Sequence, residues 1–325
     1  MNSEAIMVAV SLLYGIPSFA LYIVILFQLV RPKNRKRFGN PFFGLCFLLG
    51  VVDCFGYLDF YIFMTLPTYS FFSSFYGSSL FYPSAFTTAI YFSTYLFTYL
   101  QLFGNCFLTF NRFTCIVFPL KHNRIWRYCL PISIAVTVLS ALIPCWYLAT
   151  TSTRYVPLFD DFPDQGYAMD ADKTTYPSFS NSFNLALSNF VACGLCLVMS
   201  IVSSSFLIVR TSKTAAKNRK AELNLFFLAL LIFFLQSVFG IHQVLIYIAI
   251  KIQSDGMLTL LYTLLPWLSD LKFLSPPWVL FFVSTAIRET VLQGLPQRLY
   301  SYKKWTIGGR SVTATGVSVR SVNPR

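Results

Sequence analysis

Seven apolar runs, each long enough to cross a lipid bilayer, restrict the fold of this chain more than any other feature. A helix rises about 1.5 Å per residue, so roughly 20 residues cross about 30 Å of hydrocarbon. The runs cover Met7–Val30, Pro41–Leu66, Ala85–Phe110, Cys129–Thr150, Asn181–Val209, Leu223–Ile250 and Met257–Thr285. Unpaired backbone groups are too costly in lipid, so such runs must be helices, whereas a β-barrel would show short alternating segments. We therefore predict an all-α membrane protein, a bundle of seven transmembrane helices.

The distribution of basic residues predicts which way the bundle faces. Lysines and arginines gather in alternate connections and in the tail, at residues 31–37, 112–127, 210–220 and 288–325. The opposite loops contain only Arg154, Lys173 and Lys251. The positive-inside rule then places the N-terminus outside and the C-terminus in the cytoplasm. No basic residue precedes the first run, so it lacks the basic region of a cleaved signal peptide and should remain a membrane helix.

The chain outside the seven runs is short, and no separate soluble domain fits in it. We assign residues 1–300 to one seven-helix domain that ends in a short amphipathic surface helix. Residues 301–325 are rich in Ser, Thr, Gly and Arg, and we expect a disordered basic tail. Residues 67–84 are uncharged and aromatic, which suits either the membrane interface or a fold over the outer mouth. Residues 151–176 are acidic, which solvation alone explains, and a mild preference for cationic ligands is the alternative.

The composition excludes several classes of function. The chain is 56% hydrophobic, and its net charge of +13 falls in short clusters between apolar runs, which is membrane topology and not a nucleic-acid surface. All eight cysteines lie in or near apolar runs, so we expect no loop disulfide. The Cys193-x-x-Cys196 pair is interpreted as buried helix packing and not as a metal or redox site. His122 and His242 stand apart, so no catalytic residue, cofactor or metal site is predicted, and the chain should not be an enzyme.

One motif joins the third run to the loop that follows it. A polar residue, an arginine and an aromatic residue are followed by Pro-Leu seven and eight positions beyond the arginine, as Asn111, Arg112, Phe113, Pro119 and Leu120. This spacing resembles the inner end of the third helix in rhodopsin-like receptors. The resemblance implies that Arg112 holds the inactive state and then faces a G protein. The alternative is an ordinary positive-inside arginine, and the spacing to Pro119 and Leu120 favours the receptor.

Several short motifs look like those of nematode serpentine chemoreceptors of the Srg superfamily, classes gamma and V. They are Tyr14-Gly15-Ile16-Pro17-Ser18, Asn40-Pro41-Phe42-Phe43, Asn111-Arg112-Phe113-Thr114, Phe118-Pro119-Leu120-Lys121-His122 and Ile125-Trp126. The resemblance covers all seven helices in order and length. It implies reception of an environmental or pheromone-like small molecule at the plasma membrane of sensory neurons, in their cilia, with a heterotrimeric G protein as partner.

Two departures separate the chain from the wider rhodopsin-like pattern. Asn111 replaces the usual acid beside the arginine, so a tight carboxylate–arginine lock cannot form there. The last run has Ser275-Pro276-Pro277-Trp278 where Asn-Pro-x-x-Tyr is expected. These changes put the rhodopsin-like details of activation in doubt and leave the architecture intact.

A polar stripe follows the third run. Its members recur at intervals of three and four: Tyr91, Thr94, Thr98, Gln101, Asn105 and Arg112, with Tyr95 beside them. Such spacing puts them on one helix face, which should turn away from lipid. We take Tyr91, Tyr95 and Thr98, together with Lys272, as candidate ligand contacts, and packing between helices is the alternative. For Gln101 and Asn105 we favour packing.

Four charged residues lie within the apolar runs: Asp53, Asp59, Asp270 and Lys272. Charges inside a membrane are functional candidates by default. Asp53 is similar to the second-helix aspartate that can hold a cation in rhodopsin-like receptors, and a hydrogen-bonded structural aspartate is the alternative. Asp59 and Lys272 lie about 27 and 24 Å above the cytoplasmic face. We therefore predict an ion pair between them, with snorkelling of the lysine as the alternative.

The function that these patterns favour is a heptahelical receptor. A small molecule would bind in the outer half of the bundle, and a cytoplasmic G protein would read the response. A seven-helix transporter or channel is the alternative. A transporter should show repeated halves with broken helices in equivalent positions, which the sequence lacks.

Overall fold

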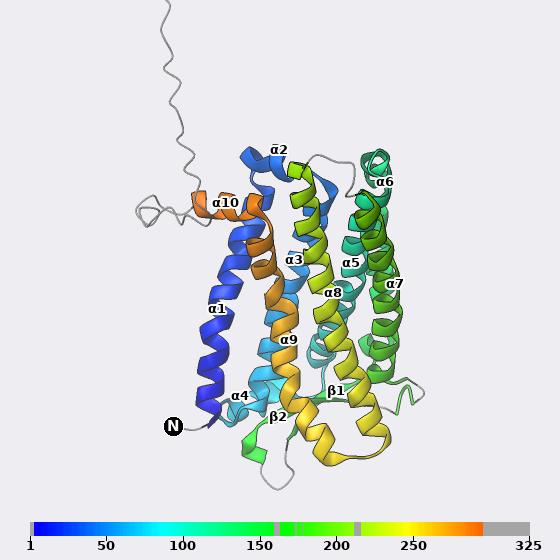
Figure 1. The fold of residues 1–325 in the computed structure, drawn as a ribbon. Helices are drawn as coiled ribbons and strands as arrows, with labels where there is room; N and C mark the ends of the chain where they lie inside the picture. Colours follow the sequence, from blue (N-terminus) through cyan, green and yellow to red (C-terminus); the bar gives the residue numbers. More distant parts are fainter. Residues whose placement is uncertain (1–2, 159–162, 173, 178, 211–215, 295–325) are drawn as a thin grey trace, which may run out of the picture.

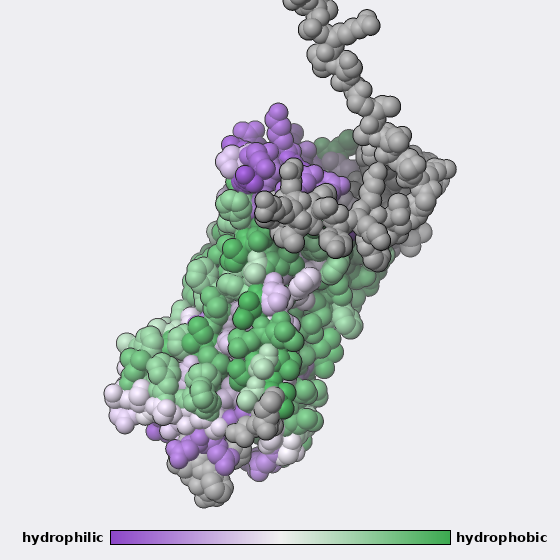
Figure 2. Space-filling model, turned by 90° about the vertical axis from the view of Figure 1, so that its left-hand side faces the viewer, coloured by the Kyte–Doolittle hydropathy of each residue, from purple (hydrophilic) through white to green (hydrophobic). Residues whose placement is uncertain are grey.

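Seven long helices run side by side in the computed structural model (Figure 1), which describes residues 3–158, 163–172, 174–177, 179–210 and 216–294. Within those residues they are α1 (Ser3–Val30), α3 (Pro41–Phe60), α5 (Ala85–Val117), α6 (His122–Leu142), α7 (Asn181–Arg210), α8 (Ala216–Lys251) and α9 (Asp255–Val283). All of these except α5 are long and apolar enough to cross a membrane. Figure 2 shows the consequence, a green hydrophobic band between two purple ends.

Helix α5 is the centre of the bundle. It packs against α3, α6, α7 and α8, so little of its surface faces outward. This position explains why a long helix with so many polar side chains is stable here, since its buried side chains include Thr94, Thr98 and Gln101. Ser84 starts the helix with a reciprocal capping box to Thr87. The inward orientation predicted for the polar stripe is therefore confirmed.

The helix boundaries around residues 111–128 differ from the predicted ones. Helix α5 continues to Val117 and so includes Arg112, and α6 begins at His122. Pro119 separates the two helices in a loop of only four residues, because proline has no N–H to continue the hydrogen-bond ladder. The fourth span was predicted to reach Thr150, but α6 ends at Leu142. Pro144 interrupts the ladder there in the same way.

One end of the bundle, here called the hairpin end, is capped by two loops. Residues 66–81 form the short helices η3 (Leu66–Thr68), η4 (Ser70–Phe72), α4 (Ser73–Tyr76) and η5 (Ser79–Phe81). Beside them, β1 (Thr153–Pro157) and β2 (Tyr167–Ala171) form an antiparallel hairpin, with Thr153 opposite Ala171. The N-terminus lies at this end (Figure 1). The hairpin was not predicted, since the acidic loop was interpreted only as a solvated segment.

Aromatic contacts join the two loops of the cap. The ring of Tyr155 lies 5.5 Å from that of Tyr76 and 5.3 Å from that of Phe81, measured between centroids. The Tyr155 hydroxyl also donates to the Phe63 carbonyl at 2.8 Å. Burial raises the pKa of Tyr76 to about 12, so its hydroxyl remains protonated and donates to the Ile62 carbonyl. The two loops therefore pack on each other at this end of the bundle.

The opposite end, here called the basic end, contains two further short helices, η1 (Pro32–Asn34) and α2 (Arg35–Phe38). Helix α10 (Thr285–Gly294) follows α9 and lies across this end (Figure 1). Arg37 pairs with Glu289 of α10 and donates to the Thr290 hydroxyl at 3.3 Å. Helix α10 thus lies where the sequence predicted a short amphipathic helix after the seventh span. The predicted tail, residues 301–325, lies outside the described residues.

Candidate functional site

A buried hydrogen-bond group at Asp53 joins four helices near the middle of the bundle. Asp53, which is 2% exposed, accepts from the Tyr22 hydroxyl of α1 at 2.5 Å and from the Gln101 amide of α5 at 2.6 Å. The same Gln101 nitrogen donates to the backbone carbonyl of Lys272 on α9 at 3.1 Å. Both carboxylate oxygens thus accept hydrogen bonds from protein donors. This arrangement agrees with the alternative of a hydrogen-bonded structural aspartate.

Gln101, for which packing between helices was favoured, joins three helices through its side chain. Its amide nitrogen bridges the Asp53 carboxylate and the backbone carbonyl of Lys272. The sequence did not identify these two partners, although the polar stripe placed Gln101 on the inward face, three residues after Thr98. The amide nitrogen of a glutamine carries two N–H donors, so it can connect a carboxylate on one helix to a carbonyl on another.

Lys272 is buried among aromatic rings. The residue is 5% exposed, and its Nζ lies 4.4 Å from the centroid of the Phe239 ring and 5.0 Å from that of Phe273. Within the described residues this Nζ has no hydrogen-bond partner. Asp53 is the carboxylate whose charge attracts it. The ammonium is therefore held by aromatic faces and a carboxylate that does not touch it.

The predicted ion pair between Asp59 and Lys272 is wrong. Asp59 instead accepts hydrogen bonds from Ser93 at 2.7 Å and from Thr94 at 2.5 Å, both on α5. The depth calculation compared heights along the helices, whereas the direction in which a side chain points depends on the rotation of its helix. Here α3 turns Asp59 toward the hydroxyls of α5.

Asp270 belongs to a third, separate group. The Tyr14 hydroxyl of α1 donates to its carboxylate, and Trp278 on the same side of α9 donates to the Ser18 hydroxyl at 2.8 Å. The four intramembrane charges therefore do not form one network in the described structure. They divide into the Asp53 group with Lys272, the Asp59 group on α5, and the Asp270 group on α1.

The candidate ligand contacts of α5 lie toward the hairpin end. The rings of Tyr91 and Tyr95 meet edge to face with centroids 5.1 Å apart, and the Tyr91 hydroxyl accepts from the Asn181 amide of α7 at 2.8 Å. Thr98 is buried and donates to the Thr94 carbonyl at 3.0 Å. Tyr91 belongs to the same buried cluster as Phe239, and the Phe239 ring covers the Lys272 ammonium. The buried cluster that contains Tyr91 thus extends through Phe239 to Lys272.

The residues of the Asn111–Leu120 motif meet at the basic end. Arg112 is 7% exposed, with its guanidinium carbon 3.5 Å from the centroid of the Phe42 ring. It donates to the Asn111 amide oxygen at 3.2 Å, so Asn111 accepts from the arginine where an acid is usual. Phe113 is half-buried, whereas Pro119 is exposed. Leu120 is 98% exposed, which is unusual for a leucine.

Two residues missed by the sequence interpretation hold this loop in place. The indole nitrogen of Trp126 donates to the Thr114 hydroxyl at 2.7 Å, and His122 lies 3.2 Å from the same oxygen through its Nδ1. Trp126 is almost completely buried. Its place in the short motif Ile125-Trp126 is the sequence feature that could have indicated this role. The bonds position α6 directly after the exposed Leu120.

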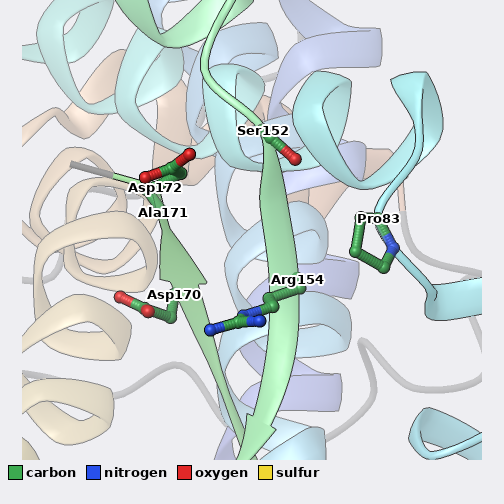
Figure 3. Close-up of a pocket in the computed structure, with 6 residues that line it drawn as sticks. All are labelled: Pro83, Ser152, Arg154, Asp170, Ala171 and Asp172. Atoms are coloured by element: carbon green, nitrogen blue, oxygen red, sulfur yellow. The ribbon is translucent and has the colours of Figure 1, made fainter. Parts of the chain in front are cut away.

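A cleft of about 430 Å³ opens at the hairpin end (Figure 3). It is lined by Pro83, Ser152, Arg154, Asp170, Ala171 and Asp172. Arg154 on β1 extends toward its cross-strand partner Asp170 on β2. Hydrogen bonds from the backbone and hydroxyl of Thr174 hold the pKa of the Asp172 carboxyl below its ordinary value. The rim of the bundle therefore presents both signs of charge.

The fold and its buried polar groups define a multi-pass membrane protein of the heptahelical type, with its polar side chains turned toward a central helix. The sequence profile of the Srg family chemoreceptors matches residues 8–291, and the chain belongs to that family. The resemblance inferred from the short motifs is thereby confirmed.

Relatives from Caenorhabditis elegans fall in two classes of serpentine receptor. The chain is 30% identical to serpentine receptor class V-1 over 123 residues, 38% of this chain and 37% of that protein. It is 39% identical to serpentine receptor class gamma-5 over 56 residues, 17% of each chain. The match to serpentine receptor class gamma-31 is 26% identical over 293 residues and covers 86% of this chain and 89% of the relative. The chain thus spans well under half of the first two relatives and most of the third.

Proposed function

We propose that the protein is a serpentine chemoreceptor, and not an enzyme, that binds a small molecule between Tyr91 and Lys272 and signals to a heterotrimeric G protein at the basic end. The observation that carries the proposal is the buried Lys272 ammonium, which has no hydrogen-bond partner in the described structure. Membership of a chemoreceptor family supports it. The positive-inside rule supports an external hairpin end and a cytoplasmic basic end.

The environment of Lys272 indicates what kind of ligand would fit. A buried ammonium is costly unless it is paired. A ligand with an anionic or hydrogen-bond-accepting group would supply a charge-assisted hydrogen bond to Lys272, and its apolar part would contact Phe239 and the tyrosines of α5. Ten residues separate Tyr91 from Gln101, about 15 Å along a helix. An elongated small molecule, environmental or pheromone-like, suits that span.

Ligand binding can be tested with two matched lysine variants. We expect Lys272→Met, which keeps the length of the side chain and removes its charge, to abolish the response of reporter cells to any volatile or pheromone-like compound that activates the wild-type receptor. Lys251 is exposed at the hairpin end of α8, so Lys251→Met should respond like wild type. A Lys272→Met receptor with wild-type surface expression and unchanged potency would contradict the assignment.

We propose that the coupling surface consists of Arg112 and the exposed loop after it. A leucine that is almost fully exposed gains free energy when a partner covers it, and Leu120 lies in the loop directly after the motif of Arg112. Leu120→Asp and Arg112→Ala should each abolish agonist-dependent calcium or cyclic-nucleotide signals while surface expression persists. Leu139 is 60% exposed on the outer face of α6, and Leu139→Ala serves as the control. Full signalling by Leu120→Asp would exclude this surface.

The family also suggests where the receptor acts. We propose that it resides in the plasma membrane of sensory neurons, at their cilia, where an environmental ligand first reaches a cell. A fluorescent fusion expressed in a nematode tests this placement, and a signal confined to internal membranes or to other cell types would refute it.

A further inference from the structure

Two cysteine thiols face each other across the interface of α5 and α7. The sulfur of Cys196 on α7 lies 3.6 Å from the sulfur of Cys106 on α5. Cys106 also lies 3.8 Å from the backbone carbonyl of Ala192, measured from its sulfur, so its side chain points directly at α7. Both thiols are free in the structure. Neither cysteine is among the residues proposed above for ligand binding or G-protein coupling.

A small cavity with a mostly apolar lining adjoins the thiol pair. It measures about 10 Å³, which is close to the space that one water-sized molecule needs. Its lining includes Cys106, Cys196 and Gln236 of α8. The Oε1 of Gln236 is buried and has no hydrogen-bond partner within the described residues, whereas its amide nitrogen donates to Asn189 at 2.7 Å. The cavity therefore offers a hydrogen-bond acceptor beside two nucleophilic sulfurs.

We propose that Cys106 and Cys196 are a modification site for hydrogen peroxide, which converts them into a disulfide between α5 and α7. Hydrogen peroxide is a small, uncharged hydrogen-bond donor, and Gln236 can accept from it. The assignment is independent of the ligand and of the G protein proposed above.

The reaction needs no further reagent. One thiol loses its proton and attacks a peroxide oxygen, the O–O bond breaks, and the departing hydroxide takes up that proton, so the products are a sulfenic acid and water. The second thiol attacks the sulfenic sulfur, the S–S bond forms, and a second water leaves. The two sulfurs lose two electrons in total, and these reduce one peroxide to two waters. The sulfurs must approach from 3.6 Å to about 2.05 Å, a movement that side-chain rotation and a small helix shift provide.

The bond would lie close to the candidate coupling residue. Arg112 follows Cys106 by six residues on the same helix, about 9 Å along its axis. A disulfide there would tie the inner part of α7 to the helix that carries Arg112. Oxidation would thus restrict how far the two helices can separate at the basic end.

Mass spectrometry of the full-length receptor in cell membranes tests the proposal. The membranes are treated with hydrogen peroxide, free thiols are blocked with N-ethylmaleimide in denaturant, and the protein is digested without reduction. We expect a linked peptide pair containing Cys106 and Cys196 that dithiothreitol abolishes. Cys129 on α6 should remain fully alkylated and provides the internal control.

Two variants distinguish a Cys106–Cys196 disulfide from one that involves the neighbouring Cys193. Cys193→Ser should retain the linked pair, because Cys193 is not the partner in contact with Cys106, whereas Cys196→Ser should lose it. The wild-type measurement decides the question even if a variant fails to fold. Recovery of both wild-type peptides only as maleimide adducts after peroxide treatment, or a link between Cys193 and Cys196, would overturn the assignment.

Discussion

The packing of α3 on α5 should depend on the absence of a side chain at Gly104. A Cβ placed on Gly104 would lie 2.3 Å from Cδ2 and 3.3 Å from Cγ of Leu49. Leu49 is 8% exposed, so it has little room to move away. Overpacking of this kind costs about 1–3 kcal/mol, and replacing a helical glycine by alanine returns about 0.5–1 kcal/mol. We expect Gly104→Ala to reduce the free energy of unfolding by up to about 2.5 kcal/mol on these figures, and to be about 1–3 kcal/mol less stable than an alanine variant at a helical glycine with free space around it.

Thermal unfolding of the purified receptor in detergent, followed by tryptophan fluorescence, measures this effect. Gly194 is the matched control, because a Cβ there would meet no atom within 4 Å. Gly194→Ala should therefore be neutral or slightly stabilising.

A double-mutant cycle shows whether the loss comes from the contact itself. Leu49→Ala alone leaves a cavity, and a methyl group at position 104 would fill part of it. The double variant should lose less than the sum of the single variants, by about 0.5–3 kcal/mol. Strict additivity, or a Gly104→Ala protein as stable as Gly194→Ala, would refute the close approach of the two helices.

Two further outcomes follow from the buried contacts. The double variant Asp59→Lys with Lys272→Asp should reach the cell surface no better than the worse single variant, because the Asp59 carboxylate faces the hydroxyls of α5 and not Lys272. Recovery of surface expression in the double variant would show that the two charges do form an ion pair. Trp126→Phe should lower the free energy of unfolding by about 0.5–1.5 kcal/mol through loss of its bond to Thr114, and unchanged thermal unfolding would show that the bond contributes nothing.

The sequence alone was sufficient for the architecture and the family. The cost of exposing backbone groups in lipid depends on the composition and length of each run, which are local properties. The short motifs that resemble the Srg family, among them Asn111-Arg112-Phe113-Thr114, are likewise local, and the family that this resemblance implied is the one whose profile matches the chain. The inward turn of the polar stripe also follows from local periodicity, because 3.6 residues per turn decide which side chains share a face.

Only the tertiary structure decided which buried groups meet. The partners of Asp59 depend on the rotation of α3 about its axis, and heights along a helix do not reveal that rotation. The bridging role of Gln101 depends on three helices converging on one amide. The approach of Cys106 to Cys196 likewise joins residues 90 positions apart. Each of these contacts depends on how whole helices pack, and the packing depends on every interface of the bundle at once.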